Sequence, residues 1–436
     1  MRPRGSTTVL AALVAAAALL AACKPGASAG SSPTGGGGTA TANGWAVNTS
    51  ACPPGATTPV ASGQDIKLGS VAALSGPAAP SAAYSQGMKL YFDKLNAEQG
   101  GVDGHKITLD TKDDQYDPAK TVPQVTSLID QDEVLAVVAE VGTPNSLAAR
   151  ALLERSCTPQ LFVISGDSRF GDPANHAWTT GGYTLYTLET RAWAQYIAQQ
   201  HPGASVASLV LDNDAGAAYS ASFANAAKEF GLKIVTAQKA ATTATNIDGQ
   251  ITAILAATPD FVVAEPPTAV CGQLIGGLKQ GGFRGGLLGV SYCAAPTVLA
   301  GAGDAANGYL WVTGFRDSTD PGNAGNPDVT EFGAAVRKYG NGLKVSSLTI
   351  DGYRLGKLTA DTVKAAAQRP GGLTRANLMN AAWNLNTTLF DAYCGTAKTN
   401  GPADPFVDEC VAVLQHTSGG TEEVTTIDEE GKGATG

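Results

Sequence analysis

The 436-residue sequence has little charge: Lys, Arg, Asp and Glu make up 15% of it, against about a quarter in typical soluble proteins. Acidic residues outnumber basic ones by 38 to 29, so the formal net charge is −9. This balance argues against a nucleic-acid-binding protein, which needs a basic face to replace phosphate counterions. Hydrophobic residues still make up 43%, which is too many for a disordered chain and enough for two domains with buried cores.

The motifs of common catalytic and metal sites are also missing. The sequence has no HExxH, no GxxxxGK[ST] and no CxxC. Residues 289–293 lack the last glycine of GxSxG, and no βαβ pattern frames the GxGxxA match at 301–306. The four histidines are far apart in the sequence: His105, His176, His201 and His416. We therefore predict no enzyme activity, no metal site and no cofactor.

A long uncharged hydrophobic run occurs near the start, at residues 9–22. As a helix it would rise about 21 Å, which is short of the roughly 30 Å hydrocarbon core of a membrane. Arg2 and Arg4 precede it, and Leu20-Ala21-Ala22-Cys23 ends it. This pattern resembles a bacterial lipoprotein signal, with residues 1–22 removed and Cys23 acylated. An ordinary signal peptide with a chance cysteine is the alternative.

Two segments have compositions that cannot bury a core. Residues 23–65 begin with a Gly-, Ser- and Thr-rich stretch and are predicted to be a flexible linker behind the lipid anchor. Residues 417–436 are polar and rich in Glu and Gly, and they are predicted to be a disordered tail.

Seven cysteines leave an even set of six if Cys23 carries the lipid. An even set outside the cytoplasm suggests disulfides, and six cysteines allow 15 pairings. Proximity in the sequence favours Cys271 with Cys293 and Cys394 with Cys410, which leaves Cys52 with Cys157. The other pairings remain open.

Between these ends, strand and helix patterns alternate in two successive rounds. The first round has predicted strands at 66–71, 107–110, 135–139 and 160–164, and the second at 205–211, 233–236, 261–264 and 286–290. Helical patterns follow most of these strands, and a last strand is predicted at 406–414. Such alternation predicts parallel sheets with helices on both faces. Two rounds of similar length predict an α/β protein with two similar, Rossmann-like lobes.

Three motifs in the first round resemble a known family. They are Leu74-Ser75-Gly76-Pro77, Asn96 followed by Gly-Gly-Val-Asp-Gly at 100–104, and Asp-Asp-Gln-Tyr-Asp-Pro-Ala-Lys at 113–120. Together they resemble the type I periplasmic solute-binding proteins of ABC importers, in their leucine/isoleucine/valine-binding branch. The resemblance implies two lobes joined by a three-crossover hinge. It places residues 66–183 and about 317–392 in the N-terminal lobe, and 184–316 and about 393–416 in the C-terminal lobe.

Ligands of open parallel sheets bind beyond the carboxyl ends of the strands, where helix N-termini point. Hydroxyls and backbone N–H groups at 142–146 are candidates to hold a carboxylate, although Ser146 also suits a helix cap. The family's amino-acid binders place an acid against the ligand ammonium, but Ser291 takes that position here, so Glu265 or Asp167 is the alternative. The predicted ligand-binding residues are Ser75, Gly142, Thr143, Asn145, Ser165, Asp167, Ser168, Asp214, Glu265, Ser291 and Tyr292. Tyr84 and Tyr183 are further candidates to stack on an apolar part of the ligand.

Two functions follow from these observations. The first is a lipid-anchored solute-binding protein that captures a small polar ligand, an amino acid or a related compound, and delivers it to an ABC permease and its ATPase subunit. The second is a sensor lipoprotein of the same fold that reports to a membrane partner. Both predict a monomer on the outer face of the bacterial cell membrane, without a nucleic-acid partner.

The lipid assignment is tested by Cys23→Ala, which removes the thiol that would carry the lipid. We expect this variant to leave the membrane fraction, measured by immunoblotting after carbonate washing of membranes. Ser28→Ala, in the same linker, is the control and should stay bound. Retention of the Cys23→Ala variant in washed membranes would contradict the assignment.

Overall fold

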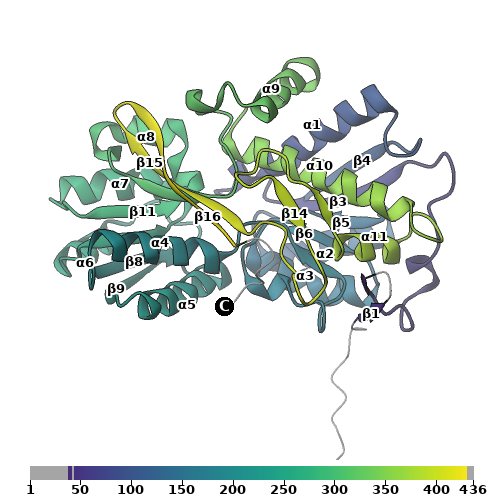
Figure 1. Cartoon of the computed structure of the whole chain (residues 1–436), viewed down its shortest axis with the longest axis horizontal. Coiled ribbons are helices and arrows are strands. Elements are labelled where there is room, and N and C mark those ends of the chain that lie inside the picture. Colours follow the sequence, from purple (N-terminus) through teal and green to yellow (C-terminus); the bar gives the residue numbers. More distant parts are fainter. Residues whose placement is uncertain (1–37, 42–43, 430–436) are drawn as a thin grey trace, which may run out of the picture. The chain divides into compact units, whose positions relative to one another are not determined.

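The computed structural model describes residues 38–41 and 44–429 (Figure 1). The predicted signal sequence and Cys23 lie outside the described residues. Within the described part, no helix combines the length and the apolar character that crossing a membrane requires.

The first lobe is built on a five-stranded parallel sheet with the order β4-β3-β5-β6-β7. Its strands are β3 (Ile66–Ala72), β4 (Ile107–Asp113), β5 (Ala136–Val138), β6 (Gln160–Val163) and β7 (Thr179–Gly181). Its helices are α1 (Ala82–Gln99), α2 (Pro118–Asp130), α3 (Thr143–Arg155), α9 (Pro327–Tyr339), α10 (Ser347–Ala367) and α11 (Arg375–Ala382). The lobe therefore combines an early and a late part of the chain.

Glycines allow α1 and α10 to pack backbone against backbone. A Cβ at Gly87 would lie 1.9 Å from the carbonyl oxygen of Thr349, and one at Gly352 would lie 2.0 Å from that of Tyr84. Larger residues at these two positions would force the helices apart. This close contact ties the late helix α10 to the early part of the chain.

The second lobe has a seven-stranded sheet with the order β16-β15-β12-β11-β10-β8-β9. Its parallel strands are β8 (Ser205–Leu211), β9 (Lys233–Ala240), β10 (Phe261–Glu265), β11 (Gly286–Val290) and β12 (Leu310–Thr313). Its helices are α4 (Tyr186–Gln200), α5 (Asp214–Glu229), α6 (Asp248–Ala256), α7 (Cys271–Gln280) and α8 (Pro296–Ala302). The predicted α/β fold with two lobes is therefore confirmed.

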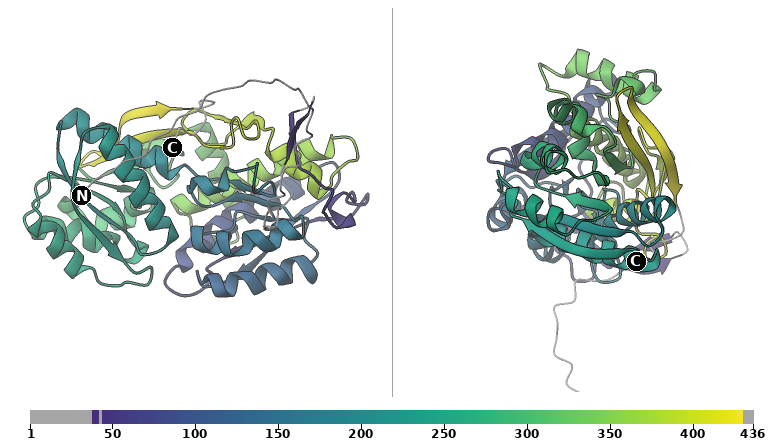
Figure 2. Two further views of the ribbon diagram at one scale, coloured as in Figure 1. Left: turned by 90° about the horizontal axis from the view of Figure 1, so that it is seen from below. Right: turned by 90° about the vertical axis from the view of Figure 1, so that its left-hand side faces the viewer.

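The chain end that was expected to be disordered forms part of this sheet. β15 (Cys410–Thr417) and β16 (Gly420–Asp428) make an antiparallel hairpin, and β15 pairs with β12. Figure 2 shows the hairpin in yellow along the edge of the second lobe. β16 is polar because it is an exposed edge strand, and this composition made it look like a tail.

The N-terminal segment is also ordered earlier than the predicted linker allows. Strands β1 (Thr39–Thr41) and β2 (Gly44–Ala46) pair, and the buried Trp45 ring meets Trp383 edge-on at 5.7 Å. The side chains of Asn384 and Asn380 accept hydrogen bonds from the backbone N–H groups of Trp45 and Val47, at 2.9 and 2.8 Å. These partners come from more than 300 residues later, so no local pattern could reveal them.

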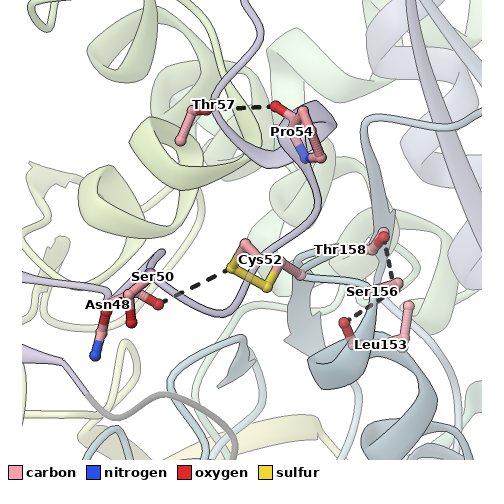
Figure 3. The surroundings of a disulfide bond; sticks show 9 residues. Asn48, Ser50, Cys52, Pro54, Thr57, Leu153, Ser156 and Thr158 are labelled. Atoms are coloured by element: carbon pink, nitrogen blue, oxygen red, sulfur yellow. Dashed lines mark hydrogen bonds between the residues drawn. A yellow bond between two sulfur atoms is a disulfide. The ribbon is translucent and has the colours of Figure 1, made fainter.

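Three disulfides join the cysteines that sequence proximity favoured. They are Cys52–Cys157, Cys271–Cys293 and Cys394–Cys410. Figure 3 shows the first of them, with Asn48 near Cys52 and with Ser156 and Thr158 near its partner. This disulfide fastens the N-terminal segment to the end of α3. The third joins the loop between the short strands β13 (Asn386–Thr388) and β14 (Thr396–Lys398) to β15.

The chain crosses between the lobes three times. The buried cores change from the first lobe to the second between Trp178 and Leu185, back again between Val312 and Phe315, and finally between Val407 and Val411. The segment that carries β13 and β14 packs with the first lobe, through Leu389, Phe390 and Ala397.

One buried network joins the three crossovers. Asp408 Oδ2 accepts hydrogen bonds from Thr184 Oγ1 at 3.0 Å and from Arg354 Nη1 at 3.3 Å. Arg354, which is 1% exposed, also pairs with Asp351 at 2.7 Å and donates to the carbonyl oxygen of Gly182 at 3.4 Å. The second crossover passes against this group at Gly314, where a Cβ would lie 2.4 Å from Asp408 Oδ2.

Gly314→Ala tests whether this close packing stabilises the hinge. The added methyl group has no space beside Asp408, so we expect the free energy of unfolding in urea to fall by about 1–3 kcal/mol. Gly301→Ala, in the last turn of α8 with open space around it, is the control and should change stability little. Equal stability of the two variants would contradict this account of the hinge.

Candidate functional site

A cavity of about 150 Å³ lies between the lobes, at the carboxyl ends of both parallel sheets. Loops after β3, β5 and β6 line it from the first lobe, and loops after β8, β10 and β11 line it from the second. The first crossover closes one side through Tyr183. This is the position that parallel sheets offer to a ligand.

Six tyrosines dominate the walls of this cavity: Tyr84, Tyr116, Tyr183, Tyr186, Tyr219 and Tyr292. Five of their hydroxyl groups already have protein partners. Tyr292 donates to the carbonyl oxygen of Pro266 at 2.6 Å, and Tyr219 donates to Glu189. The hydroxyls of Tyr116 and Tyr183 lie beside the side chains of Asn213 and Ser291 respectively. The rings are therefore the main surface that these side chains offer to a ligand.

Tyr186 shows how deeper residues support the wall. Its hydroxyl lies 3.3 Å from Thr143 Oγ1 and 3.5 Å from Ser165 Oγ, and these two hydroxyls are 2.7 Å apart. Its ring stacks on Tyr219 with a centroid distance of 4.0 Å, and Tyr219 stacks on Trp193 at 5.7 Å. The wall is thus a packed aromatic stack whose outer member is held by two buried hydroxyls.

The N-terminus of α3, which was expected to hold a carboxylate, lies close to the ring of Tyr116. Gly142 has φ of 105°, a conformation that favours glycine. A Cβ on it would lie 2.7 Å from the ring of Tyr116. Pro144, in the first turn of α3, has no N–H to donate. The ring and the proline leave this helix end a poor cradle for an anion.

Glu265, at the end of β10, is the acidic residue in the cavity wall. It is 4% exposed, and Oε2 accepts a hydrogen bond from the backbone N–H of Leu211 at 3.1 Å. Burial raises its pKa well above the ordinary value, and the nearby Glu189 adds to the rise. No Lys, Arg or His occurs among the described residues that line the cavity. The Glu265 carboxyl group therefore has no cation of the protein beside it.

The predicted ligand-binding residues fall into three groups in the structure. Gly142, Glu265 and Tyr292 line the cavity. Thr143 and Ser165 lie behind Tyr186, and Asn145 lies deeper, bonded to Asp114 at 2.8 Å and Thr121 at 2.9 Å. The remaining residues lie outside this cavity: Ser75, Asp167, Ser168, Asp214 and Ser291.

Ser168 is exposed, and each of the other four outer residues has a partner or a position that the structure shows. Ser75 donates to Asp113 at 2.6 Å, and Asp167 pairs with Arg169 at 2.6 Å. Arg169 also approaches Asp214 of the second lobe at 3.5 Å, so this ion pair bridges the two lobes. Ser291 lines a second cavity of about 520 Å³ beside β12 and the β15–β16 turn.

Sequence reasoning missed Tyr116, Tyr186 and Tyr219. Tyr116 lies within the Asp-rich motif at 113–120, and that position was a usable signal. Tyr186 and Tyr219 lie on helices, where an aromatic residue normally indicates core packing. Among the residues placed in the structure, no group of His, Cys, Asp and Glu side chains has the arrangement of a metal site.

Glu189, behind the aromatic stack, generates a testable pH dependence. Burial raises its pKa from 4.5 to about 8, although the hydrogen bond from Tyr219 lowers the pKa and so opposes part of this rise. The folded protein thus holds a proton that the unfolded chain releases between about pH 4.5 and 8, and stability falls as pH rises through this window. Glu189→Gln removes that loss. We expect its stability relative to wild type to increase by at most about 1.4 kcal/mol per pH unit.

The measurement is urea unfolding of both proteins at a series of pH values. Tyr219→Phe is the matched comparison, because it keeps the buried carboxyl group and removes the hydrogen bond to its ionised form. In this variant the pKa of Glu189 should be higher, so stability should go on falling to a higher pH than in the wild-type protein. A stability difference between Glu189→Gln and wild type that does not change with pH would be inconsistent with a buried, protonated Glu189.

Comparison with known families and structures gives a consistent result. The family described as Periplasmic binding protein matches residues 65–421. No curated protein matches the chain.

Among solved structures, a branched chain amino acid ABC transporter protein from Thermus thermophilus with bound valine is 23% identical, with a TM-score of 0.75, covering 84% of this chain and 96% of that one. A fatty acid ABC transporter substrate-binding protein from Thermomonospora curvata is 20% identical, with a TM-score of 0.74 and coverage of 86% and 95%. A solute-binding protein from R. palustris in complex with benzoate is 17% identical, with a TM-score of 0.70 and coverage of 85% and 99%. At these identities the likeness establishes the fold, and the ligands named for these three proteins differ from one another.

Proposed function

The chain belongs to the periplasmic binding protein family, and we propose that it is the lipid-anchored solute-binding protein of an ABC importer. It captures a small solute between its lobes and presents the closed form to a permease, whose separate ATPase subunit spends ATP. The observation that carries the proposal is the interlobe cavity, because residues of both lobes and of the first crossover wall it. A solute in this position contacts both lobes at once and so favours the closed arrangement.

The contacts across the cleft support such a closing motion. Arg169 reaches Asp214, and Tyr116 lies beside Asn213, each from the first lobe to the second. The Arg169–Asp214 pair is largely exposed, so it contributes little stability by itself. A solute that bridges the lobes would therefore supply much of the free energy of closure.

Cys23 and the segment behind it supply the anchor in this proposal. Lipid on Cys23 would hold the protein at the outer face of the cell membrane. About twenty residues lie between Cys23 and Trp45, whose side chain is buried.

The expected ligand was an amino acid or a related compound. Glu265 in the cavity wall is an acidic residue that could pair with the ammonium group of such a ligand. The cavity offers little for a carboxylate, because the ring of Tyr116 lies close to the start of α3 and no basic side chain is present among the lining residues.

The proposal is tested by a thermal-shift screen of the purified protein against amino acids, amines, amides, carboxylic acids and polyols. A solute that binds only the folded state at a hundred times its Kd should add about 2.7 kcal/mol of stability. The same solute should reduce the radius of gyration in small-angle X-ray scattering, because it closes the lobes. Chemical turnover of that solute, or no shift with any class, would count against the proposal.

A further inference from the structure

The cavity wall contains one side chain that can carry charge at neutral pH, and that charge is negative. Glu265 lies among four tyrosines close enough for its charge to raise their pKa values: Tyr116, Tyr186, Tyr219 and Tyr292. A buried carboxylate without a partner is costly, so it either takes up a proton or meets a cation. Because no basic side chain is present among the described lining residues, such a cation must come from the ligand.

The rest of the wall suits an organic cation. Tyrosine rings attract ammonium groups through the negative charge of their faces, and several rings around one carboxyl group form an aromatic cage. Ser81, another lining residue, has a buried hydroxyl oxygen without a hydrogen-bond partner. That oxygen can accept a hydrogen bond from an ammonium N–H. Apolar contacts from Ile164, Leu211 and Leu348 complete the wall.

An anionic ligand group would find no comparable support. The ring of Tyr116 lies close to Gly142 at the start of α3, and the hydroxyls of Thr143 and Ser165 are committed to Tyr186. A carboxylate in this cavity would also lie near Glu265, and like charges repel strongly in a buried site.

We propose that the cleft selects an organic monocation, an ammonium group on a small apolar or aromatic body, and that Glu265 is the residue that determines this specificity. The inference rests on the proposed solute-binding function and adds the class of solute. Glu265 supplies the counter-charge, the tyrosine rings enclose the ammonium group, and the start of α3, close to the ring of Tyr116, offers little to a carboxylate.

Proton release is a consequence of this arrangement. In the empty cleft burial raises the pKa of the Glu265 carboxyl group well above its ordinary value, and the groups that face it are tyrosines and Glu189, none of them cationic. A bound cation favours the ionised form, so binding releases a proton. Affinity for a cation should then rise with pH below that pKa, by at most about tenfold per pH unit.

The experiment is titration calorimetry of the full wild-type protein with matched pairs of probes. Choline is compared with its neutral isostere 3,3-dimethylbutan-1-ol, and 2-phenylethylamine with 2-phenylethanol. Benzoate, an anion, and valine, a zwitterion, are the probes that carry a carboxylate. We expect at least one cation to bind at least about 30-fold more tightly than its neutral partner. At pH values below the pKa of Glu265 in the empty cleft, its binding heat should depend on the ionisation enthalpy of the buffer, because binding of the cation then releases a proton.

Glu265→Gln keeps the shape of the side chain and removes its charge. It should weaken cation binding by about 100-fold or more and leave binding of the neutral isostere unchanged. Asp212→Asn is the matched control, because Asp212 follows β8 nearby but is 61% exposed and pairs with Lys239 at 3.2 Å. If Glu265→Gln does not fold, the buffer and pH series on the wild-type protein decides the question.

The outcomes distinguish the organic-cation specificity from the proposed solute-binding function. Tightest binding of a neutral probe or of one that carries a carboxylate, or cation binding without proton release, would overturn the organic-cation inference and leave solute binding intact. Failure of every cation probe would also overturn the inference. Failure of all three classes, together with an empty thermal-shift screen, would count against solute binding itself.

Discussion

The guanidinium group of Arg354 is the contact on which the two-lobe arrangement depends. It lies on α10 of the first lobe, pairs with Asp351 on the same helix, and reaches Asp408 in the third crossover and Gly182 in the first. Asp408 in turn packs against Gly314 in the second. A buried charge that lost one of these partners would be left uncompensated, at a cost of several kcal/mol. The three crossovers therefore meet at one buried point.

The cleft depends on this fixed point because its walls come from both lobes. Tyr183 lies on the first crossover, next to Thr184 of the buried network. Tyr186 begins the next helix and is braced by Thr143 and Ser165 of the other lobe. The hinge and the aromatic wall thus share one short stretch of chain, so a change in lobe angle changes the shape of the cavity directly.

Local patterns predicted much of the fold. The strands at 66–71, 205–211 and 286–290 were recognisable because buried parallel strands are short, apolar and followed by turns. β7 and β12, and the helices α4 and α9, were not predicted from the sequence. The strand predicted at 406–414 corresponds to β15, which begins later, at Cys410. The candidate site was less predictable: Gly142, Glu265 and Tyr292 were expected in it and line the cavity, whereas Tyr116, Tyr186 and Tyr219 also line it and were not expected.

The sequence by itself determined the class of the protein, because alternating apolar segments and the motifs near residues 74–77, 100–104 and 113–120 are local properties. It also favoured the cysteine pairs that the structure contains. Tertiary structure alone decided the rest: the edge strand β16, the ordered segment from Trp45 onward, the position of the third crossover and the chemistry of the cleft. The physical reason is distance along the chain. Tyr116, Tyr219 and Glu265 become neighbours only when both sheets are folded and closed on one another, and no local pattern records which side chain will cover another.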